Sequence, residues 1–101
     1  MRFVRWTILA GLLPAMATGQ TGASLYRTKC ASCHGAKGEG RAAIKNSNLL
    51  TAEAKQRSDA ELAEAIAKGG KKQSSAHAYE RKGVSAEQVK LLVQYVRELQ
   101  R

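Results

Sequence analysis

The sequence predicts a small all-α protein, and three observations support this. The 101 residues allow one domain. Two segments, beginning at Ser58 and Ser85, have Glu or Gln three residues after the Ser, which is the pattern of a helix capping box. No stretch shows the alternation of apolar and polar residues that is typical of a strand. We therefore expect helices joined by polar, glycine-containing loops.

The first predicted helix runs from Gly22 to Cys30, with Leu25 and Tyr26 as its apolar residues. A loop over residues 36–48 follows, in which glycines serve as turn residues. Because Gly22 has no side chain, another helix could approach the first one closely at this position.

The second predicted helix begins after Ser58, continues to Lys68 and ends at Gly69. Its inner stripe contains Leu62, Ala65 and Ile66. The last predicted helix runs from Ala86 to about Gln100. Its apolar face consists of Val89, Leu92, Val93, Val96 and Leu99.

Residues 30–34 form a C-x-x-C-H run, the pattern of a c-type haem attachment site. Cys30 and Cys33 are three positions apart on one helical turn, so each thiol can add to one vinyl group of the same porphyrin edge. His34 then lies where its imidazole can bind the iron from the proximal side. The motif predicts one covalent haem c held by these three residues.

Other interpretations of the two cysteines are a redox dithiol, part of a zinc site and a short-range disulfide. A thioredoxin-like dithiol should follow a strand in a βαβ unit, and no strand pattern is present here. A zinc site needs four ligands, and the only histidine besides His34 is His77. The disulfide stays open as an alternative for an exported chain.

The surroundings of the motif resemble the class I cytochrome c family from about Gly22 to the C-terminus. The resemblance is carried by the run GASLYRTKCASCHG over residues 22–35, by Gly38-Glu39-Gly40, and by the segment from Ser85 to Leu99. It implies a cytochrome c-like helical fold wrapped around one haem, with the last helix crossing the first near Gly22. In so small a chain the haem would serve as the core.

Two departures from the family concern the iron ligands. Family members usually have a proline in the proximal loop, whose carbonyl accepts a hydrogen bond from the ligand imidazole; here no proline follows Pro14. We expect a carbonyl between Lys45 and Asn48 to accept that bond. The family also places a Met before the last helix as sixth ligand, but both methionines of this chain, Met1 and Met16, lie near its start.

His77 stands about where the family has that Met, and it is our candidate for the sixth iron ligand. The alternatives are an open sixth position, or ligation by Lys71, Lys72 or Lys82. Tyr79 is expected either to pack over the haem edge or to be a surface aromatic residue.

The first 17 residues resemble a secretory signal peptide. Arg2 and Arg5 precede a short apolar run that ends at Pro14, and Ala15-Met16-Ala17 fits a cleavage site. The run is much shorter than the roughly 20 residues that span a bilayer. We expect residues 18–101 to form the monohaem cytochrome c domain, located in the periplasm without a membrane span.

Charge suggests the type of partner. The whole chain has a formal net charge of +9, and removal of Arg2 and Arg5 and addition of two haem propionates would leave about +5. This favours a redox partner with an acidic docking surface, although a merely solvated basic surface is the alternative. Nucleic acid is not expected, because the basic residues are scattered.

The function indicated by these features is one-electron transfer by a haem carrier, not enzymatic catalysis. Replacement of the family's Met by His77 should lower the reduction potential. The alternative is a haem-based module that binds or senses a small ligand at an open or weakly held sixth position. A third interpretation is a subunit that passes electrons to or from a larger exported complex.

Overall fold

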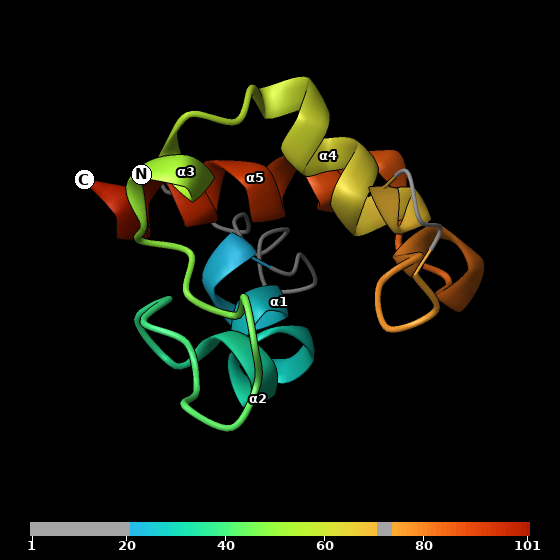
Figure 1. Cartoon of the computed structure of the whole chain (residues 1–101). Helices are drawn as coiled ribbons and strands as arrows, with labels where there is room; N and C mark the ends of the chain where they lie inside the picture. The colour runs from blue at the N-terminus through green and yellow to red at the C-terminus, as the bar shows by residue number, and fades with distance from the viewer. Residues whose placement is uncertain (1–20, 71–73) are drawn as a thin grey trace, which may run out of the picture.

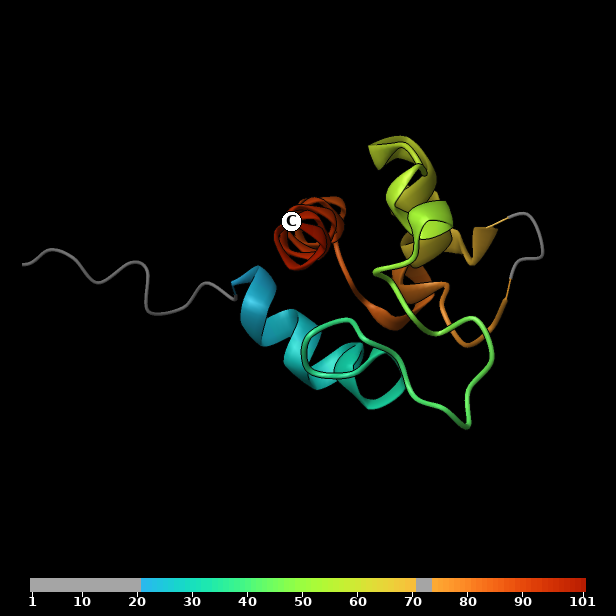
Figure 2. The ribbon, with the colours of Figure 1, turned by 60° about the vertical axis from the view of Figure 1, so that its left-hand side comes forward.

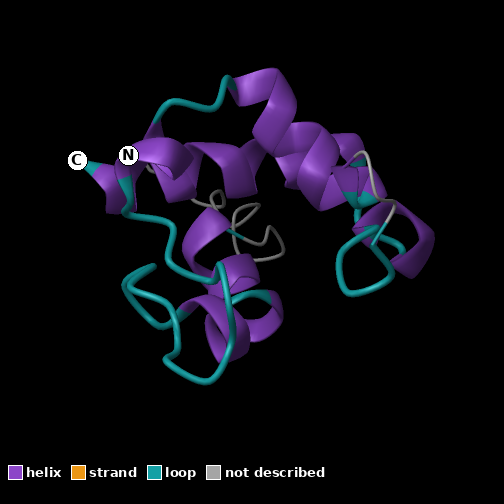
Figure 3. Cartoon of the chain, in the orientation of Figure 1, coloured by secondary structure: helices purple, strands orange, loops and turns teal. Residues whose placement is uncertain are grey.

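The computed structural model describes residues 21–70 and 74–101, and its regular elements are all helical (Figures 1 and 3). In chain order they are α1 (Gly22–Lys29), α2 (Ala31–His34), α3 (Ala52–Lys55), α4 (Asp59–Lys68), the 3₁₀ turn η3 (Tyr79–Lys82) and α5 (Ala86–Gln100). The described ranges contain no strand. The predicted all-α class is therefore confirmed. The predicted signal peptide, residues 1–17, lies outside the described residues, as do Lys71 and Lys72.

The predicted helix boundaries are largely confirmed, with one correction. The first helix does not continue through Cys30: α1 ends at Lys29 and α2 begins at Ala31, because Cys30 has φ −122° and ψ −32°, outside the helical range. Both predicted capping boxes are present, at Ser58 and at Ser85. The short helix α3 was not predicted; its signal is Thr51, whose hydroxyl accepts a hydrogen bond from the Ala54 N–H.

The centre of the fold is the crossing of α1 and α5, and Figure 2 shows α5 end-on beside α1. Leu25 of α1 and Leu92 of α5 are both 0% exposed. The rings of Tyr26 and Tyr95 lie 5.3 Å apart, centroid to centroid. A Cβ added to Gly22 would lie 2.5 Å from the Leu91 carbonyl oxygen, so the close approach expected at this glycine is confirmed.

Helix α4 covers another part of α5 and also contacts η3. Its capping box begins it at Ser58, and Gly69 ends it in the left-handed conformation, with φ 86°. Leu62 is buried in the core, and Ile66 packs against that core, as expected from the inner stripe. Within the described ranges no helix is long and apolar enough to cross a membrane.

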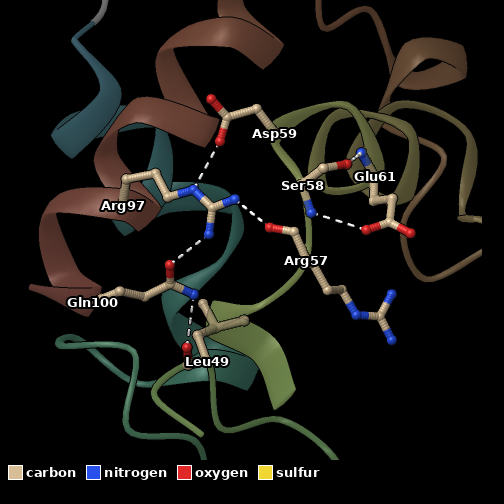
Figure 4. A network of polar contacts seen from close by, with 7 residues as sticks. All are labelled: Leu49, Arg57, Ser58, Asp59, Glu61, Arg97 and Gln100. Atoms are coloured by element: carbon tan, nitrogen blue, oxygen red, sulfur yellow. Dashed lines mark hydrogen bonds and ion pairs between the residues drawn. The ribbon is translucent and has the colours of Figure 1, made fainter. Parts of the chain in front are cut away.

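A polar network at the C-terminal end of α5 joins it to two other segments (Figure 4). Arg97 Nε donates to Asp59 at 2.8 Å, and the same guanidinium donates to the Arg57 carbonyl and to the Gln100 side chain. Gln100, only 8% exposed, donates in turn to the Leu49 carbonyl at 2.9 Å. Because Asp59 is largely exposed, its ion pair adds little stability. The part-buried Gln100–Leu49 hydrogen bond contributes more to holding the loop before α3 in place.

We predict that Gly22→Ala destabilises the protein by about 1–3 kcal/mol, because the added methyl forces α1 and α5 apart. Denaturant unfolding of the haem-loaded protein measures this. Ser24→Ala on the same helix is the control and should change the free energy of unfolding little, since Ala is the better helix former. Equal stability of the two variants would contradict the proposed close crossing.

Candidate haem-binding site

The C-x-x-C-H residues form the tight turn that contains α2. The Cys33 N–H and the His34 N–H both donate to the Cys30 carbonyl, at 3.1 and 2.9 Å. Neither cysteine is in a disulfide; Cys30 is half-buried against the core and Cys33 is exposed. One short piece of backbone therefore carries two free thiols and an imidazole, which is the donor set that covalent haem attachment requires.

The environment of the cysteines disfavours the alternative interpretations. Burial raises the pKa of the Cys30 thiol to about 11, whereas the attacking cysteine of a redox dithiol has a lowered pKa. Over residues 21–70 and 74–101, no group of three His, Cys, Asp or Glu side chains is arranged to hold a metal ion by itself. A zinc site built from these residues therefore has no support.

The proximal ligand candidate, His34, is held by a hydrogen bond on the far side of its ring. Its Nδ1 lies 2.7 Å from the Ser47 carbonyl oxygen. An Nδ1–H that donates to this carbonyl leaves Nε2 as the free lone pair that a metal needs. The expectation that a carbonyl between Lys45 and Asn48 replaces the family's proline carbonyl is confirmed.

Ser47 itself is fixed by its hydroxyl group. The side-chain oxygen accepts a hydrogen bond from the Arg41 N–H at 2.8 Å, and its proton is directed to the Ile44 carbonyl at 2.7 Å. Ser47 is 5% exposed, and the preceding Asn46 has a left-handed φ of 62°. Sequence reasoning did not single out Ser47, because any residue can offer a backbone carbonyl.

His77, the candidate sixth ligand, lies opposite His34. The ring centroids are 6.0 Å apart, and the ring planes differ by 24°. Two metal–nitrogen bonds of about 2 Å, with each ring centre roughly 1 Å beyond its nitrogen, span about 6 Å. Burial, together with His34 and Lys82, lowers the pKa of His77, which favours the neutral form of the ring that binds metals. The separation of the two rings therefore leaves room for an iron ion between the two imidazoles.

Tyr79 attaches the His77 segment to the end of α1. Its hydroxyl donates to the Lys29 carbonyl at 2.7 Å, and its ring lies edge-on to the His77 ring, 6.3 Å between centroids. Burial raises the pKa of Tyr79. Tyr79 is therefore a half-buried connecting residue and not a simple surface aromatic.

Of the three lysines that were alternatives to His77, the structure describes only Lys82. Its ammonium lies 4.6 Å from the centre of the Tyr79 ring and 3.5 Å from the Ala76 carbonyl. The ammonium of Lys82 therefore already has two contacts of its own, one with an aromatic ring and one with a carbonyl oxygen.

A separate groove of about 620 Å³ lies between α4, α5 and η3, with Ala63, Ala67 and Val93 in its wall. None of the four predicted haem residues lines it. It is distinct from the candidate haem site.

A helical fold with two thiols and an imidazole on one tight turn, and a second imidazole 6.0 Å from the first between ring centroids, has the donor set of a c-type haem protein. The family model described as "Cytochrome c" matches residues 19–100. The chain therefore belongs to the cytochrome c family, whose members bind haem c covalently and transfer electrons to partner proteins. No curated protein and no solved structure was found to match it.

Tyr79→Phe should lower the free energy of unfolding by about 1 kcal/mol, because the Lys29 carbonyl loses its side-chain donor. The matched control is Tyr95→Phe, which removes a hydroxyl that has no hydrogen-bond partner among the described residues. Chemical denaturation of both variants compares them. If they lose the same stability, the Tyr79–Lys29 bond does not hold the His77 segment.

Proposed function

We propose that this protein is a periplasmic one-electron carrier of low reduction potential, with its haem iron ligated by His34 and His77. The observation that supports it best is the proximity of the His34 and His77 rings, whose centroids lie 6.0 Å apart and whose planes differ by 24°. A carrier needs nearly the same coordination in both oxidation states, and two imidazoles supplied by the chain itself would provide this. A His in the place of the family's Met favours a low potential.

Each motif residue has a distinct role in this proposal. The thiol of Cys30 and that of Cys33 would each add across one vinyl group, with the sulfur bonding to one carbon and a proton to the other. The haem supplies ferric–ferrous one-electron exchange. His34, oriented by Ser47, would hold the iron on the proximal side, and His77, whose neutral form burial favours, would hold it on the distal side.

Location and partner follow from the sequence features. Removal of residues 1–17 by export would leave residues 18–101 as the mature domain, without any methionine. The excess of Lys and Arg over Asp and Glu favours a redox partner with an acidic docking surface, because opposite charges accelerate encounter.

The central experiment is His77→Ala, examined by optical and electron paramagnetic resonance spectroscopy. We expect the ferric haem to change from low spin to high spin at neutral pH, and carbon monoxide to bind the ferrous form at least about tenfold faster. His77→Met should instead keep six-coordinate iron and raise the reduction potential.

Lys82→Ala is the matched control for this experiment and should leave the spectrum unchanged. A wild-type spectrum in His77→Ala would remove His77 from the coordination sphere. If the wild-type protein itself is high-spin and binds carbon monoxide rapidly, the haem-based ligand-binding module replaces the carrier as the better interpretation.

A further inference from the structure

We propose that the Ser47 side chain is a positioning residue that lowers the reduction potential by holding the Ser47 carbonyl against His34. The inference rests on the proposed function, in which His34 binds the iron. It concerns the hydroxyl group of Ser47, which does not itself touch the His34 ring.

The hydrogen bonds around Ser47 connect the loop of residues 36–48 to the C-x-x-C-H turn at two places, through Arg41 and through His34. The Arg41 guanidinium donates to the Ser32 carbonyl at 3.1 Å and to the Ala31 carbonyl at 3.3 Å. The Arg41 N–H donates to Ser47 Oγ at 2.8 Å, and the Ser47 carbonyl accepts from His34 Nδ1 at 2.7 Å. The loop is therefore attached both to the backbone of the turn and to its imidazole.

The loop is buried and closely packed where Ser47 approaches His34. Ser47 is 5% exposed, and its hydroxyl has a donor in Arg41 and an acceptor in Ile44. A Cβ added to Gly40 would lie 2.8 Å from the Asn48 backbone, so the two sides of the loop are in direct contact. The Gly40 N–H also donates to the His34 carbonyl at 2.6 Å.

The hydroxyl compensates for a missing rigid residue. A proline would fix φ near −65°, but the chain has no proline in this loop. Instead, Asn46 at φ 62° and the hydroxyl of Ser47 determine the direction of the carbonyl. Loss of the hydroxyl would leave the Arg41 N–H without its buried acceptor, and the loop would relax to find another.

The consequence for the iron follows from the ligand chemistry. A strong hydrogen bond from Nδ1–H makes the imidazole a better donor, which favours ferric over ferrous iron. A weaker or misaligned bond has the opposite effect. The Ser47 hydroxyl therefore acts on the potential through the carbonyl of its own residue.

The test compares haem-loaded Ser47→Ala with wild-type protein by redox titration and by proton NMR of the ferrous form. We expect a higher potential, equivalent to roughly a two- to tenfold change in the ferric-to-ferrous ratio, where tenfold corresponds to about 59 mV. The His34 Nδ1 proton should also exchange with solvent at least about tenfold faster. Ser47→Thr keeps the hydroxyl and should restore both values toward wild type.

Ser24→Ala, the same substitution on α1, is the control and should change neither reading. If Ser47→Ala does not fold, Asn46→Ala strains the left-handed position while keeping the hydroxyl, and it should raise the potential in the same direction. A Ser47→Ala protein that is less stable but has wild-type potential and proton exchange would overturn the inference. Failure of the proposed function would be seen in the wild-type protein itself, which would then lack a covalent haem ligated by His34.

Discussion

The hydrogen bond between His34 and the Ser47 carbonyl is the interaction on which the arrangement of this protein depends. The C-x-x-C-H turn fixes the backbone positions of Cys30, Cys33 and His34, but it does not fix the rotation of the His34 ring. That rotation is set by a loop outside the motif. Two backbone hydrogen bonds hold this loop. The Gly40 N–H donates to the His34 carbonyl, and the Leu49 N–H donates to the Gly38 carbonyl.

The rest of the chain keeps the two sides of the candidate haem site in place. On the proximal side, Gln100 at the end of α5 holds the Leu49 carbonyl, so the C-terminal helix supports the loop that orients His34. On the distal side, Tyr79 attaches the His77 segment to the end of α1. Because α1 and α5 cross at Gly22, both attachments meet in one closely packed helix pair. A chain of this size needs such shared supports, since its own apolar core is small.

Local patterns allowed much of this to be predicted from the sequence. Both capping boxes, the apolar face of α5 and the close approach at Gly22 depend on spacing or on the absence of a side chain, which a sequence displays directly. The break at Cys30 and the buried Gln100 were not identified, and the carbonyl that orients His34 was placed only within residues 45–48, not at Ser47 itself. They depend on backbone angles and on contacts between distant segments, and a backbone carbonyl has no residue type that marks it.

The central claim is that one porphyrin is bonded covalently to Cys30 and Cys33, and the mass of the intact protein tests it most directly. The chain should be expressed in a bacterium with a competent cytochrome c maturation system, then treated with a thiol-alkylating reagent under denaturing conditions. The expected mass is that of residues 18–101 plus one haem, with no alkylation of either cysteine. A colourless protein without the haem mass, alkylated at both cysteines, would contradict it.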